Sequence, residues 1–95
     1  MGESVMRKRL VFSGIVQGVG FRWRARHAAE AVGASGWVRN DRDGTVTMEL
    51  QGTVAQLESV LAALERGAYI QIDRIDARRV PVEENERGFR YADEY

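Results

Sequence analysis

The alternation of apolar and polar residues predicts a strand followed by a helix near the N-terminus. Residues 9–16 are rich in β-branched and aromatic types and stop at glycines, which is typical of a strand. From Phe21 onward the spacing changes, and apolar residues recur on one face of a helix over residues 21–32. The members of this face are Phe21, Ala25, Ala28 and Val32. Gly33 stands where helices commonly end, so we expect the helix to stop there.

The middle of the chain predicts a β-hairpin. Residues 36–40 and 45–52 have the composition of strands, and Asp43-Gly44 between them supplies residue types that turns favour. In the second strand the apolar residues alternate with polar ones, so we expect them to face the core. They are Val46, Met48 and Leu50.

A second helix is predicted directly after the hairpin. Thr53 and Gln56 have the spacing of a capping box, in which two side chains satisfy backbone donors at the helix start. The apolar stripe of this helix has helical spacing. It consists of Val54, Leu57, Leu61 and Leu64. We expect the helix to end at Gly67.

Two further strands complete the predicted order. Residues 69–82 alternate like a strand, but the alternation slips between Ile72 and Ile75, so we expect a bulge or an early end. Residues 88–92 form a weak last strand. The order predicts an α+β, ferredoxin-like βαββαβ sandwich, with an antiparallel sheet and two helices on one face. We expect residues 1–95 to form a single domain, with residues 1–6 as a flexible N-terminus.

The glycine-rich connection between the first strand and the first helix is the main candidate for a binding site. Gly18 and Gly20 flank a helix start, where unpaired backbone N–H groups and a partial positive charge favour an anion. Arg22 in the first helical turn is placed to add a bidentate contact to a phosphate. Such a turn is equally often only a tight connection. The loop matches neither a Walker A motif nor a Rossmann fingerprint, which demotes nucleotide binding.

Composition and charge narrow the possible functions. The 14 basic residues balance 14 acidic ones, whereas a nucleic-acid-binding protein normally carries a basic excess. The absence of cysteine excludes disulfides, thiolate metal sites and a phosphocysteine mechanism. The N-terminus does not resemble a signal peptide, and no apolar run approaches a membrane span. We therefore expect a cytoplasmic protein that binds neither nucleic acid nor membrane.

Two segments together resemble the signature segments of the acylphosphatase family. These are GIVQGVGFR at residues 14–22, and GWVRN at residues 36–40 followed by a DG turn. The resemblance implies hydrolysis of the carboxyl–phosphate bond of small acyl phosphates, without metal or cofactor. It also implies a monomer, with inorganic phosphate as product and inhibitor.

The resemblance also implies a role for individual residues. Arg22 corresponds to the family's phosphate-binding arginine, and Asn40 corresponds to the asparagine that positions water. The backbone amides of the phosphate cradle would come from Gln17, Gly18, Val19, Gly20 and Phe21. The chemistry requires no strong general acid, because a carboxylate leaves without a proton at neutral pH.

The sequence departs from the family pattern in two places and leaves an alternative open. Asp41 stands where a small hydroxyl residue is frequent, which places a negative charge beside the expected anion site. Gly67-Ala68 replaces a common Gly-Pro in a connector. The alternative function is a non-catalytic anion- or RNA-binding module, or a relative of domains that bind carbamoyl phosphate within a larger enzyme.

Three aromatic or imidazole side chains have structural interpretations in the sequence. We expect His27 to be a surface residue on the first helix rather than a catalyst. Trp37 and Val38 point to opposite faces of their strand, and Trp37 is expected to be a structural aromatic. Trp23 could either wall the site or cover the end of the sheet.

Overall fold

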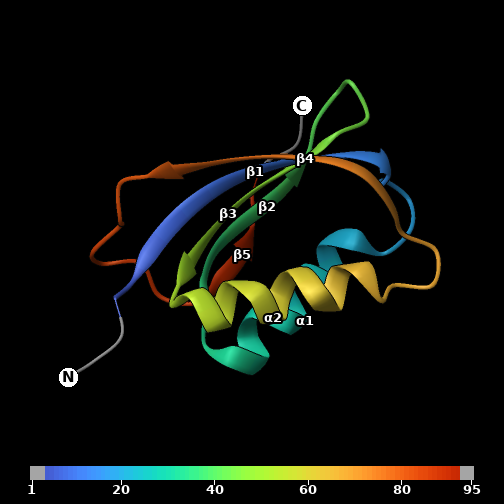
Figure 1. Cartoon of the computed structure of the whole chain (residues 1–95). Coiled ribbons are helices and arrows are strands. Elements are labelled where there is room, and N and C mark those ends of the chain that lie inside the picture. Colours follow the sequence, from blue (N-terminus) through green and yellow to red (C-terminus); the bar gives the residue numbers. More distant parts are fainter. Residues whose placement is uncertain (1–3, 93–95) are drawn as a thin grey trace.

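The computed structural model describes residues 4–92. The elements are β1 Met6–Ile15, α1 Phe21–Val32, β2 Ser35–Asn40, β3 Val46–Gly52, α2 Val54–Glu65, β4 Gln71–Val80 and β5 Phe89–Tyr91. The strands form one curved layer, and both helices lie against the same face of it (Figure 1). This arrangement confirms the predicted ferredoxin-like α+β sandwich.

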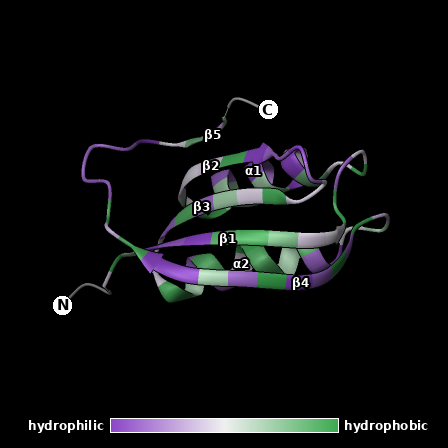
Figure 2. Cartoon of the chain, turned by 90° about the horizontal axis from the view of Figure 1, so that it is seen from above, coloured by the Kyte–Doolittle hydropathy of each residue, from purple (hydrophilic) through white to green (hydrophobic). Residues whose placement is uncertain are grey.

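The five strands lie in the order β4-β1-β3-β2-β5. β1 runs antiparallel to β3 and β4, and β2 runs antiparallel to β3. β5 instead pairs with β2 in the parallel direction, so the sheet is mixed at this edge rather than antiparallel throughout. The reason is that the chain leaves β4 at one edge, reverses and crosses to the opposite edge beside β2 (Figure 2).

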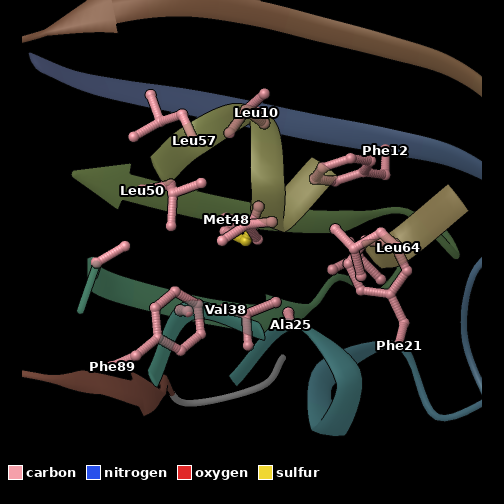
Figure 3. Packing of buried hydrophobic residues seen from close by; sticks show 14 of the residues in the cluster. Leu10, Phe12, Phe21, Ala25, Val38, Met48, Leu50, Leu57, Leu64 and Phe89 are labelled. Carbon is pink, nitrogen blue, oxygen red and sulfur yellow. The ribbon is translucent and has the colours of Figure 1, made fainter. Parts of the chain in front are cut away.

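The core lies between the helices and one face of the sheet (Figure 3). Val46, Met48 and Leu50 of β3 are fully buried, which confirms the predicted inward face of that strand. Phe12 of β1 packs edge-on against Phe21 at the start of α1, with 4.8 Å between the ring centroids. Burying one such side chain contributes about 1.5–3 kcal/mol, so these contacts fix the start of α1 against the sheet.

Helix α1 has the predicted bounds, and its buried face is turned slightly from the predicted one. Phe21, Ala25 and Ala29 are buried, whereas Ala28 and Val32 are partly exposed and pack against the core from the side. The helix ends at Gly33, whose φ of 75° is the left-handed conformation expected after a helix.

Helix α2 has the predicted capping box at its start. Thr53 accepts a hydrogen bond from the Gln56 backbone, and the Gln56 side chain accepts one from the Thr53 backbone. Val54 was predicted to be in the apolar stripe, but it is 51% exposed because Val60, not Val54, faces the core. The helix ends at Glu65, slightly before the predicted Gly67.

Strand β4 contains the predicted irregularity. Ser13 pairs with Arg74 and Gly14 pairs with Ile72, which leaves Asp73 as an extra residue in the ladder. This is a β-bulge. A Cβ atom at Gly14 would collide with the Gln71 carbonyl oxygen, so glycine is required at this position of β1.

The N-terminal strand begins earlier than the sequence predicted. Met6, which we had assigned to the flexible segment, pairs with Gly52 of β3. Residues 1–3 of that expected segment lie outside the described residues.

Candidate active site

The loop between β1 and α1 contains two glycines in the left-handed conformation. Gly18 has a φ of 73° and Gly20 has a φ of 79°. A Cβ atom added at either position would meet no described atom within 4 Å beyond the adjacent residues. Backbone conformation, rather than crowding, therefore requires glycine here. The open space around both positions leaves the loop backbone accessible to a ligand.

Helix α1 starts at this loop without help from a side chain. Gly20 is its N-cap residue, and no capping side chain among residues 4–92 bonds to the first turn. The first helical hydrogen bond runs from the Arg24 N–H to the Gly20 carbonyl. The preceding N–H groups lack helical partners and carry the positive end of the helix dipole, as the predicted anion site requires.

Apolar side chains anchor the loop from below. Val19 packs against the core, and Phe21 is 2% exposed. The backbone amides on either side are therefore fixed relative to the sheet, which favours a preformed anion site over a flexible one.

The Gln17 side chain ties the loop to the turn of the β2–β3 hairpin. Its Nε2 atom donates to the Asp41 carbonyl at 2.7 Å and to the Thr45 carbonyl at 2.9 Å. The sequence assigned only the backbone of Gln17 to the site, so this contact was missed. It brings two segments that are far apart in the sequence to the same end of the sheet (Figure 1).

Arg22 lies in the first turn of α1 and is partly exposed. Its guanidinium carbon lies 5.8 Å from the ring centroid of Tyr91 in β5, and that of Arg26 lies 5.3 Å from the same ring. Cation–π contacts at this distance favour one orientation of a long side chain. Tyr91 is thus a neighbour of the predicted site that the sequence did not reveal, because β5 reaches this helix only through the crossing of the sheet.

Asn40 is the last residue of β2, opposite Val46 of β3, and it is partly exposed. No other side chain in the described part of the chain holds its amide by a hydrogen bond. The next residue, Asp41, begins the turn to which Gln17 binds. The structure therefore brings the strand end that carries Asn40 and the glycine loop to the same end of the sheet.

The negative charge of Asp41 is compensated within the protein. Its Oδ1 atom accepts from Arg39 Nε at 3.0 Å, and its Oδ2 atom accepts from Thr47 Oγ1 at 2.6 Å. The Oδ2 atom also lies 3.0 Å from Thr45 Oγ1, whose one hydrogen is shared with Asp43. A carboxylate in an ion pair with a further donor repels a nearby anion less than an unpaired one. The departure from the family pattern is thus accompanied by its own neutralising partners.

A second acidic residue shapes the same turn. The Asp43 carboxylate accepts from the Thr45 hydroxyl at 2.6 Å and from the Thr45 N–H at 3.0 Å. These two bonds hold the pKa of Asp43 below its usual value. Gly44, with a φ of 93°, then completes the turn.

Trp23 and His27 form a separate pair on the exposed side of α1. Their rings stack with 3.8 Å between centroids, and His27 Nδ1 lies 2.8 Å from the Trp23 carbonyl oxygen. Trp23 is 59% exposed. His27 is a surface residue as predicted, and the described contacts give neither residue a role in the site.

The most deeply buried charge lies elsewhere, on the face of the sheet without helices. Arg7 is 1% exposed and donates to Glu49 at 2.7 Å and to Glu86 at 2.6 Å. Burial alone would raise the pKa of Glu86, but the hydrogen bond and charge of Arg7 outweigh it and hold that pKa below the usual value. Burial would lower the pKa of Arg7, and the same carboxylates raise it instead. This cluster ties the segment before β5 to the sheet.

On the sheet face away from the helices, nucleic-acid bases would need exposed aromatic rings on which to stack. Trp37 projects from β2, and the guanidinium carbons of Arg9 and Arg39 lie 5.6 and 5.2 Å from its ring centroid. Arginine contacts therefore occupy this ring within the protein, as expected for a structural aromatic.

Residues 4–92 contain no group of acidic, histidine or cysteine side chains with the geometry of a metal site. Neither helix of the described chain has the length and hydropathy that a bilayer crossing requires.

Comparison with known proteins identifies the family. The acylphosphatase family model matches residues 8–91, which include the glycine loop and the whole β2–β3 hairpin. The chain belongs to the acylphosphatase family. An acylphosphatase from Koribacter versatilis is 36% identical over 91 residues, covering 95% of this chain and 83% of that relative.

Solved structures of the family share the fold. The crystal structure of acylphosphatase from Bacillus subtilis has a TM-score of 0.83 and 28% sequence identity, covering 94% of this chain and 99% of that one. Full-length HypF, in a phosphate- and nucleotide-bound form, has a TM-score of 0.86 and 25% identity. That match covers 99% of this chain but 12% of HypF, so a similar domain also occurs as a small part of a larger protein.

Proposed function

We propose that the protein hydrolyses the carboxyl–phosphate bond of small acyl phosphates, with the glycine loop, Arg22 and Asn40 as its machinery. The family match supports this activity. It offers no support for the alternative, a non-catalytic anion- or RNA-binding module. The observation that carries the residue assignment is the Gln17 bridge, because it joins the loop to the strand end that carries Asn40.

The start of α1 binds the phosphoryl group in this mechanism. We assign the backbone N–H groups of residues 17–21 to the phosphoryl oxygens, because two left-handed glycines lie in this loop and the helix dipole favours an anion there. Arg22 adds a planar guanidinium that forms two parallel hydrogen bonds to phosphoryl oxygens. These contacts also neutralise the charge on those oxygens in the transition state.

The chemical step needs little beyond positioning. A water oxygen attacks phosphorus in line with the departing carboxylate oxygen, so that a P–O bond forms to water as the P–O bond to the acyl group breaks. The carboxylate leaves as an anion because its conjugate acid titrates at about pH 4. Asn40 orients the water through its side-chain amide. An amide does not act as a base at neutral pH, so the water proton passes to a phosphoryl oxygen of the substrate.

Inorganic phosphate, as the product, occupies the same amides and guanidinium and acts as a competitive inhibitor. A monomeric state stays a prediction from the family resemblance. The span of the family match supports one acylphosphatase-like domain over residues 1–95. A cytoplasmic location stays a prediction from the sequence.

The test is release of inorganic phosphate from benzoyl phosphate, measured with a metal chelator present. We expect saturable turnover well above spontaneous hydrolysis, with competitive inhibition by inorganic phosphate. A rate equal to the spontaneous one would overturn the hydrolase assignment in favour of a binding module. Loss of turnover on chelation would overturn the metal-independent mechanism.

A further inference from the structure

The turn that follows β2 contains a hydrogen-bond cluster that the mechanism above does not use. The Asp41 carboxylate accepts hydrogen bonds from Arg39 Nε at 3.0 Å and Thr47 Oγ1 at 2.6 Å, and it lies 3.0 Å from Thr45 Oγ1. The carbonyl of the same residue accepts from Gln17 at 2.7 Å. One residue thereby links β2, the turn, β3 and the glycine loop.

We propose that Asp41 is a positioning residue that sets Asn40 relative to the glycine loop. The peptide bond between Asn40 and Asp41 contains the Asp41 N–H, which donates to the Thr45 carbonyl at 2.9 Å. Restraining the Asp41 N–H, side chain and carbonyl therefore restrains the backbone that carries the Asn40 side chain. Thr47 provides the shortest contact, and its side chain is 4% exposed, so it forms a rigid base for the carboxylate. This inference rests on the proposed role of Asn40 in orienting water.

A carboxylate suits this task better than the hydroxyl that is frequent at this position in the family. A hydroxyl has one hydrogen and two lone pairs, whereas a carboxylate accepts several hydrogen bonds at once. Asp41 uses this capacity, since Arg39 and Thr47 both donate to it, and Thr45 shares its one hydroxyl hydrogen between Asp41 and Asp43. The cost is a negative charge close to the anion site.

Arg39 compensates most of the negative charge that Asp41 places near the anion site. Its Nε atom lies 3.0 Å from the carboxylate, and the two side chains are 22% and 15% exposed. At this degree of burial, solvent screens the pair less than it would at an open surface. Arg39 therefore preserves anion affinity indirectly, by compensating Asp41.

The principal experiment compares Asp41→Ala with the control Asp76→Ala, which removes an exposed carboxylate on β4 that pairs with Arg74 and not with the turn. For Asp41→Ala we expect kcat on benzoyl phosphate to fall about 10- to 100-fold, because a small misplacement of a positioning group has that effect. KM and phosphate inhibition should stay within about twofold, since they report ground-state anion contacts. Asp76→Ala should keep the kcat of the parent. A lower melting temperature with unchanged kcat in Asp41→Ala would overturn the proposal.

Thr47→Val tests the same contact from the neighbouring strand without altering any charge. If both residues act through one hydrogen bond, the double variant Asp41→Ala/Thr47→Val loses no more kcat than Asp41→Ala alone. Losses that multiply would show independent effects and overturn the shared positioning role. This cycle is also informative if Asp41→Ala folds poorly, because Thr47→Val by itself should lower kcat while KM is kept.

The charge-compensation step has its own test. Arg39→Gln should raise KM and the phosphate inhibition constant, more strongly at low ionic strength, because the Asp41 charge then acts on the anion. Adding Asp41→Asn to this variant should restore the affinity. An affinity that stays low in the double variant would overturn this step.

A readout independent of turnover separates this proposal from the proposed function. If the parent fails to hydrolyse benzoyl phosphate, the proposed function fails, and the NMR signals of the Asn40 side-chain amide still report its position. Inorganic phosphate should shift these signals in the parent and in Asp76→Ala but not in Asp41→Ala. A full shift in Asp41→Ala would overturn the positioning role.

Discussion

The two helices are both 12 residues long and pack against the same sheet, yet they begin in opposite ways. Helix α2 begins at Thr53, whose side chain forms a complete capping box with Gln56. Helix α1 begins at Gly20 in the left-handed conformation, with no capping side chain in the described chain. In α2 a side chain thus accepts from a backbone N–H of the first turn, whereas in α1 no capping side chain does so in the described chain.

This difference separates a structural helix start from a functional one. A capped N-terminus contributes stability and leaves fewer backbone donors for a ligand. An uncapped start gives up about 1 kcal/mol of that stability and keeps an anion site. The protein compensates at α1 by other means, because Phe21 packs on Phe12 and Gln17 holds the loop to the hairpin.

The largest expected effect is that of Arg22→Lys at the second residue of α1. The charge is retained, but the planar pair of donors is lost, so we expect kcat/KM to fall by about 10³-fold. Steady-state kinetics and phosphate inhibition on the folded variant measure this. The matched control is Ala55→Lys, at the same position of α2, which should behave like the parent. Unchanged phosphate inhibition in Arg22→Lys would exclude Arg22 as a phosphate ligand.

Asn40→Ala should be next, because it separates chemistry from binding at the same end of the sheet. Removing the amide should lower turnover by about 10²–10³-fold while phosphate inhibition stays close to that of the parent. The competing interpretation is that Asn40 only starts the turn. A lower melting temperature with persisting turnover would favour that interpretation.

Gly18→Val tests whether the backbone of the loop before α1 binds phosphate. With φ at 73°, valine strains or remodels the loop, and we expect phosphate affinity to fall by about tenfold or more. The control is Gly33→Val, which has nearly the same φ of 75° but lies at the other end of α1. Both variants should lose thermal stability, but only Gly18→Val should lose phosphate affinity, as measured by calorimetric titration. Equal phosphate binding in the two would make the loop merely a connection.

The smallest effect is expected at the capped helix. Thr53→Ala removes the side-chain acceptor of the capping box and should lower the free energy of unfolding by about 1 kcal/mol. Chemical denaturation measures this loss, and turnover should be unchanged. A loss of turnover comparable to that of the α1 variants would contradict the division between the two helix starts.

Much of the fold was predictable because its signals are local. The bounds of α1, the capping box of α2 and the inward face of β3 each depend on residues a few positions apart. The bulge in β4 was also visible, since an extra residue shifts the alternation within one strand. The exposure of Val54 was not visible, because it depends on which side of α2 the sheet covers.

For the site, the sequence by itself determined the chemistry of its parts: a glycine loop before a helix, an arginine in the first turn, and an asparagine at the end of a strand. Tertiary structure alone decided how the parts meet. The Gln17 bridge to the hairpin turn depends on strand order, the approach of Tyr91 to Arg22 depends on the crossing to β5, and the partners of Asp41 depend on the folded shape of the hairpin turn. The physical reason is that these contacts join segments 24 or more residues apart or complete a turn in three dimensions, and side-chain periodicity carries no information about either.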